Sequence, residues 1–142
     1  MAGTIVATTT SRKGKGIVRI DCALTCVGGA ISAQAIGSAY GRLVAIATDP
    51  TYGAGATMTS TADVLLTDAT TGAPIFTDLT FGTAEYKRPT AAVVDAAGAA
   101  ITPATTANDV NRDIFVAGKL NLAIANATST DTGLISFIFE EG

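Results

Sequence analysis

Residues that could do chemistry are few in this chain, and histidine is absent from all 142 positions. Histidine is the commonest general base and metal ligand, so Ser-His-Asp and Cys-His nucleophile systems are excluded. Asp109 and Asp113 lie close together in a Thr- and Asn-rich stretch, where we expect solvated loop carboxylates. Glu140 and Glu141 are adjacent and would point to opposite faces of a strand. We therefore expect no enzymatic activity and no cofactor, although a carboxylate pair for glycoside hydrolysis could still come from distant positions.

The two cysteines, Cys22 and Cys26, lie in a strand predicted over Ile17–Cys26. Alternation places both on the apolar face of that strand, about 13 Å apart, which is too far for a disulfide between them. A zinc site needs two further cysteine or histidine ligands, and the chain has neither. We expect two buried, reduced core residues and no metal.

Two short segments carry clustered positive charge. Arg12, Lys13, Lys15 and Arg19 form a solvated basic face or an electrostatic contact with an acidic partner surface. The second segment is Tyr86-Lys87-Arg88-Pro89. It is either a contact loop, since Tyr and Arg are enriched at interface hot spots, or an edge strand stopped by proline.

The first sixteen residues admit two interpretations. Gly14 and Gly16 bracket Lys15 and give a flexible joint. The run Thr4–Thr10, which contains Ile5 and Val6, has high β-propensity. It could be part of an extended N-terminal arm over residues 1–16 that adds as a strand to a neighbouring subunit. Alternatively it is an edge strand of the same domain, which otherwise spans residues 17–142.

Composition argues for a protein that stays assembled with other subunits. Only 15% of the residues are charged, against roughly 25% in typical soluble domains. Alanine, threonine and glycine fill much of the chain, with 27, 23 and 15 residues. A monomer with so few charges would have poor colloidal stability, so we expect a homo-oligomer, a dimer or trimer.

Charge and hydropathy also disfavour several classes. The net charge is −3, and basic residues are not massed on one predicted face, which disfavours nucleic acid as a partner. No apolar run reaches 18 residues, so we expect no transmembrane helix and no membrane partner. The first six residues lack the charged start and apolar stretch of a secretory signal, so we expect synthesis in the cytoplasm.

The chain is punctuated by turn signals every 8–14 residues, and no long segment keeps a helical apolar period. This pattern predicts an all-β, antiparallel β-sandwich or small, jelly-roll-like β-barrel. The last thirty residues give the clearest signal, with strands at Ile114–Ile124 and Leu134–Phe139 joined as a closing hairpin. Further strands are expected at Ile17–Cys26, Ala30–Ile36, Arg42–Thr48, Ala62–Thr67 and Ile75–Phe81, the last two forming a hairpin. By propensity, Ala30–Ile36 would also fit a helix. A long loop is expected over Ile101–Arg112.

Four segments between residues 41 and 140 carry a likeness of pattern. They are Gly41–Ile46 ending near Pro50, Asp63–Asp68 before a Gly turn, Tyr86–Pro89 followed by Val94–Gly98, and Gly118–Asn126 with Thr132–Ile135. In these segments the chain resembles the capsid decoration (cement) proteins of tailed bacteriophages and related small head proteins. The resemblance implies a non-enzymatic β-sandwich that binds an outer capsid surface, often as a trimer or dimer, and it carries over no active site.

From these observations we expect a structural protein of a phage virion that holds neighbouring capsid subunits together, with the major capsid protein as its partner. The expected contact residues are Ile5, Val6, Arg12, Lys13, Lys15, Tyr86, Lys87 and Arg88. Two alternatives remain. One is a tail or fibre subunit. The other is a small carbohydrate-binding or hydrolytic β domain, which an exposed aromatic platform or a carboxylate pair in a cleft would favour.

Overall fold

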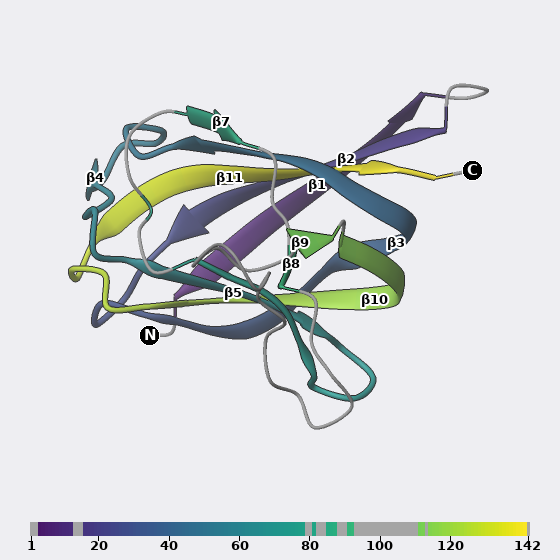
Figure 1. Ribbon diagram of the computed structural model, residues 1–142. Coiled ribbons are helices and arrows are strands. Elements are labelled where there is room, and N and C mark those ends of the chain that lie inside the picture. Colours follow the sequence, from purple (N-terminus) through teal and green to yellow (C-terminus); the bar gives the residue numbers. More distant parts are fainter. Residues whose placement is uncertain are drawn as a thin grey trace, which may run out of the picture.

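The computed structural model describes residues 3–12, 16–78, 81, 85–87, 91–92, 111–112 and 114–141. These residues form strands and turns and contain no helix, so the predicted all-β class is confirmed. None of them belongs to a helix that could span a membrane. The strands are β1 Thr4–Arg12, β2 Ile17–Thr25, β3 Ile31–Asp49, β4 Ala56–Thr57, β5 Asp63–Asp68, β6 Pro74–Asp78, β7 Glu85–Lys87, β8 Ala91–Ala92, β9 Asn111–Arg112, β10 Ile114–Ala125 and β11 Asp131–Glu140 (Figure 1).

The described strands form one large curved sheet in the order β1-β2-β11-β3-β10-β5-β6, with β4 beside β11 and β7 beside β3. β8 and β9 pair separately. All these pairings are antiparallel except that of β4 with β11. This architecture is consistent with the expected β-sandwich or small barrel.

The long strand β3 joins the two layers of the fold. Its first part, up to Leu43, pairs with β10, and its last part, from Arg42, pairs with β11 on the opposite edge. Figure 1 shows β3 and β10 curling together at one end of the molecule. Gly41 lies in this bend with φ 154°, and a Cβ there would meet the carbonyl oxygen of Glu140. Only glycine allows so close an approach of the two backbones.

The core lies between the layers and is built by period-two alternation. In β2, the residues of the apolar face, Ile20, Cys22 and Leu24, are at most 2% exposed, while their neighbours Arg19 and Thr25 are exposed. In β10, the buried alternate residues are Ile114, Val116, Leu120, Leu122 and Ile124, with the half-buried Gly118 between them. The largest fully buried side chains are Phe81, Phe137, Phe139, Ile20, Leu24, Ile31, Leu43, Ile46, Leu66, Leu120, Leu122 and Ile124.

Two expectations about pairing are corrected. β10 and β11 form where strands are expected, but they do not form a hairpin, because β3 lies between them in the sheet. The two separate strands expected at Ala30–Ile36 and Arg42–Thr48 are one strand of 19 residues. The expected hairpin of residues 62–67 with 75–81 is confirmed as β5 paired with β6.

The expected N-terminal arm is also corrected. β1 pairs with β2 along its whole length, from Thr4 opposite Thr25 to Arg12 opposite Ile17. Residues 4–12 are therefore the edge strand of the domain's own sheet, which is the alternative to a separate arm over residues 1–16. The boundary expected between residues 16 and 17 falls at the turn of a β1–β2 hairpin. The ends of β1 and β2 next to this turn project beyond the rest of the sheet in Figure 1.

Candidate functional site

The contact residues predicted from the sequence do not come together in the described structure. Ile5 packs partly buried against the core, whereas the next side chain, Val6, is 66% exposed. Arg12 ends β1, while Tyr86 lies in β7 opposite Ala47. The side chains of Arg12, Tyr86 and Lys87 lie outside the described residues, as do Lys13, Lys15 and Arg88 entirely.

The positions of β1 and β7 explain this separation. In this layer the strands run β1-β2-β11-β3-β7, so β1 and β7 lie at opposite edges with three strands between them. At about 4.8 Å per strand step, the two edges are roughly 19 Å apart. A partner could touch both predicted clusters only by covering the whole width of this layer.

A different surface does assemble at the end of the molecule where β3 bends. One row of directly paired residues crosses four strands, from Ile17 in β2 to Glu140, Arg42 and Phe115. Directly opposite residues in an antiparallel sheet share a face, so these four side chains lie along one row of the outer face.

Tyr40 lies diagonally beside Phe115 on the same outer face, since it pairs with Ala117. We call the residues Ile17, Tyr40, Arg42, Phe115, Glu140 and Glu141 the end surface. The end of β1, the start of β2, the end of β11 and the bends of β3 and β10 lie at the same end of the molecule in Figure 1.

Large apolar side chains of the end surface are open to solvent. Phe115 is 72% exposed, Tyr40 62% and Ile17 43%. Single exposed apolar residues are normal, but neighbouring ones such as Tyr40 and Phe115 commonly mark a binding site. Their types also fit, because aromatic residues and arginine are enriched in protein interfaces.

Polar contacts hold the backbone of the end surface in place. Arg42 forms an ion pair with Glu140 at 3.3 Å. The backbone N–H of Tyr40 donates to a carboxylate oxygen of Glu141 at 3.2 Å, and the N–H of Glu141 donates to the carbonyl of Gly16 at 2.6 Å. These bonds tie the hairpin turn, β11 and the β3 bend together, so the aromatic side chains project from a fixed platform.

A polar trio lies on the outer face of β2 and β11. Ser136 donates to an oxygen of Asp21 at 2.5 Å, and Arg19 forms an ion pair with that oxygen at 2.7 Å. Burial alone would raise the pKa of Asp21, but the bonds from Ser136 and Arg19 and the charge of Arg19 together lower it. A carboxylate held in its charged form is a poor general base near neutral pH, so we interpret the trio as structural.

The thiols of Cys22 and Cys26 are free and buried, as expected from the sequence. Burial, aided by the charge of Asp21, raises the pKa of Cys22 to about 12. Burial and the charge of Asp131 raise that of Cys26 to about 11. Neither thiol is a nucleophile near neutral pH. Within the described residues, no three cysteine, aspartate or glutamate side chains gather as a metal site would require.

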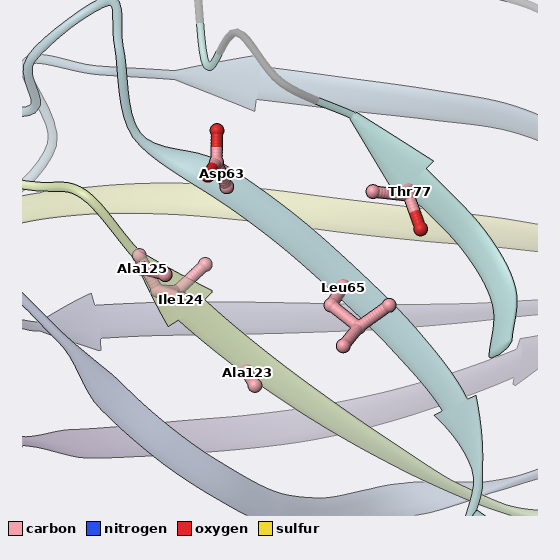
Figure 2. A pocket seen from close by; sticks show the side chains of 6 residues that line it. All are labelled: Asp63, Leu65, Thr77, Ala123, Ile124 and Ala125. Carbon is pink, nitrogen blue, oxygen red and sulfur yellow. The ribbon is translucent and has the colours of Figure 1, made fainter. Parts of the chain in front are cut away.

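A hollow of about 220 Å³ lies on the outer face of β5, β6 and β10 (Figure 2). It is lined by Asp63, Leu65, Thr77, Ala123, Ile124 and Ala125. Asp63 is the one carboxylate in this lining, and it accepts a hydrogen bond from Asn126 at 2.5 Å. The described lining residues include no aromatic side chain and no second carboxylate, so they form neither the platform nor the paired carboxylates of a carbohydrate site.

Comparisons with known proteins add no family to this description. No protein-family model matches the chain, and no curated protein and no solved structure matches it.

Proposed function

We propose that the chain is a non-enzymatic structural protein of a phage virion, which binds the outer capsid surface and stabilises contacts between capsid subunits. The observation that carries the proposal is the end surface, where exposed Phe115, Tyr40 and Ile17 surround the Arg42–Glu140 ion pair. The likeness of residues 41–140 to capsid decoration proteins supplies the partner, the major capsid protein.

Binding at the end surface would work by apolar anchoring on a preformed platform. Phe115 and Tyr40 can enter shallow pockets of a partner with little loss of entropy, because aromatic side chains have few rotatable bonds. The charges of Arg42 and Glu140, which lie between Ile17 and the aromatic anchors, would orient the partner. Several copies, each held weakly, would gain avidity when they bind one particle together.

The proposal is tested by sedimenting the purified protein with phage heads that lack it. The wild-type chain should pellet with the heads in a saturable manner. The double variant Tyr40→Ala/Phe115→Ala should bind at least about tenfold more weakly, the effect of losing two hot-spot side chains. Tyr52→Ala is the matched control, because Tyr52 is 47% exposed in the turn after β3 and lies outside the end surface.

Two outcomes would contradict the proposal. Equal binding by the double variant and the wild type would remove the end surface from the contact. Failure of the wild type to bind heads would remove the capsid as partner. Cryo-electron microscopy of native particles with density for the chain only on the tail would instead favour the alternative, a tail or fibre subunit.

The exposed pair Tyr40 and Phe115 also supports a second candidate, a small carbohydrate-binding domain, since sugar rings stack on aromatic side chains. We favour a protein partner because Ile17 and an ion pair share the surface with the aromatic residues. Glycan-array binding that is lost in Tyr40→Ala/Phe115→Ala would reverse this preference.

A further inference from the structure

The side chains in the row across the end surface follow a symmetric order of chemical types. Ile17 of β2 lies opposite Glu140 of β11, which lies opposite Arg42 of β3, which in turn lies opposite Phe115 of β10. The row is therefore apolar, acidic, basic and apolar. With about 4.8 Å between neighbouring strands, it is roughly 14 Å wide, and its midpoint lies between β11 and β3.

A row of this order is complementary to itself. In a two-fold dimer whose axis lies in the interface and runs along the strands between β11 and β3, each position faces the symmetric position of the second copy. Glu140 then faces Arg42 of the partner subunit, and Ile17 faces Phe115 of the partner subunit. Moving the axis onto β11 would place Glu140 against its own copy, and moving it onto β3 would do the same to Arg42. Only the central axis matches all four positions.

The charges at the centre of the row can reach a second molecule. Arg42 and Glu140 are 3.3 Å apart in one chain, and their side chains are 30% and 60% exposed. In the dimer, each arginine would lie beside the glutamate of its own chain and face that of the other. An exposed ion pair contributes little alone, whereas a network of four alternating charges contributes more.

Tyr40 extends the contact along the axis. It lies two residues before Arg42 on the outer face of β3, and the antiparallel ladder places it level with the end of β11. Across the axis it would face the end of β11 in the second copy, beyond Glu140 of the partner subunit. The backbone of this region is already fixed by the bonds from Tyr40 to Glu141 and from Glu141 to Gly16, so binding orders little of it.

We propose that the end surface binds the end surface of a second copy of this chain about this two-fold axis. The occupant is a second copy because charge and apolar character match at four positions in a single register. The end surface has few residues compared with the roughly 20–30 that each partner of a stable complex contributes, so the dimer is weak and forms at high micromolar concentration. The inference rests on the proposed function for one consequence, which is that the second copy and the capsid compete for the end surface.

Charge reversal tests the contact between chains. Arg42→Glu gives a row with two acids and Glu140→Arg a row with two bases, so like charges would meet across the axis in either variant. Sedimentation at high micromolar concentration should show wild-type dimers, with at least about tenfold weaker association in both variants. A mixture of the two variants should restore dimers. Because the ion pair within each chain stays broken in the mixture, restoration can come only from contact between chains.

Two further variants complete the test. Arg42→Glu/Glu140→Arg keeps both the pair within the chain and the match across the axis, so it should form dimers as the wild type does. Lys119→Glu is the matched control, because it makes the same change of charge as Arg42→Glu at an exposed position of β10 outside the end surface, and it should also behave as wild type. A monomeric wild type, or a mixture of folded single variants that stays monomeric, would overturn the inference.

Binding to phage heads tests the competition separately. The amount of wild-type chain bound to heads should fall below a simple saturation curve at concentrations where dimers form. A curve that dimer formation leaves unchanged would show that the second copy and the capsid use different surfaces, and would overturn the competition. Dimers that do not bind heads would contradict only the proposed function, whereas a chain that binds heads but stays monomeric would contradict only this inference.

Discussion

Strands β11 and β1 have similar lengths but opposite surroundings. In β11, five consecutive residues, Ile135–Phe139, are buried, so both faces of the strand are covered. In β1, residues 6–11 are exposed in succession, and only β3 passes close to the strand, with Gly37 beside Thr9. β11 lies between β2 and β3, whereas β1 has a backbone neighbour only in β2. The difference indicates that β11 stabilises the fold, while the outer part of β1 is available for contact with other molecules.

The largest expected effect comes from a pair of phenylalanines. Phe137→Ala in β11 should lower the free energy of unfolding by about 3–5 kcal/mol, because it leaves a cavity at a fully buried site. Phe115→Ala in β10 makes the same chemical change at a side chain that is 72% exposed, and its effect should stay within about 0.5 kcal/mol. Urea denaturation of both variants measures the difference. Similar losses would mean that Phe115 is covered in solution.

A smaller effect is expected at Asp131, the first residue of β11. Its Oδ2 accepts the N–H groups of Thr59 at 3.0 Å and Thr128 at 2.9 Å, and the residue is 2% exposed. Asp131→Ala should cost about 2–3 kcal/mol in the free energy of unfolding, because two donors lose a charged acceptor.

Asp68 provides the matched control for Asp131. It accepts two backbone N–H groups in the same way, from Thr70 and Thr71, but in a turn open to water. Asp68→Ala should lower the thermal midpoint clearly less than Asp131→Ala, since water can replace the lost acceptor. Equal midpoints would show that burial does not decide the cost.

Glycine substitutions at the β3 bend test how tightly β11 and β3 approach. Gly41→Ala should cost about 2 kcal/mol or more, because the new methyl group meets the backbone of Glu140 in addition to the strain of a positive φ. Gly72→Ala also has positive φ, but nothing lies within 4 Å of its Cβ position, so about 1 kcal/mol is expected. Chemical denaturation compares them, and a smaller loss at Gly41 would contradict the close approach.

The smallest effect concerns pH and Asp21, which links β2 to Ser136 of β11. The pKa of Asp21 is lowered below its ordinary 3.8 in the folded chain. Its contribution to stability is therefore present above about pH 4 and is lost as the pH falls through the folded-state pKa. Thermal midpoints from pH 7 to pH 3 should fall more steeply for the wild type than for Asp21→Asn. Asp68, whose pKa is also lowered, is present in both proteins and cancels in the comparison.

The sequence predicted the positions of single strands better than it predicted which strands pair with one another. Alternation correctly indicates which face of β2 and β10 is buried, because the period of two is local. The β5–β6 hairpin is equally local, since Asp68 and Gly72 form its turn. The placement of β3 between β10 and β11 is not local, because it pairs residues that lie far apart in the sequence along both edges of one strand.

The end surface was beyond sequence reasoning for the same reason. Tyr40 and Phe115 are 75 positions apart in the sequence, and only the pairing of β3 with β10 makes them neighbours. One local signal was present, since Phe115 occupies an outward position between buried Ile114 and Val116. A large aromatic residue at a position where alternation expects a polar one is a sign of contact with a partner.

The shared strand β3 has a consequence for how the molecule comes apart. β3 is hydrogen-bonded to β10 in one layer and to β11 in the other. Separating the two layers would therefore break the hydrogen bonds of β3 with β10 or with β11. Heat or denaturant should therefore melt both layers in a single cooperative transition. Amide protons along the middle of β3, where Arg42 and Leu43 have strand neighbours on both edges, should be among the last to exchange with solvent.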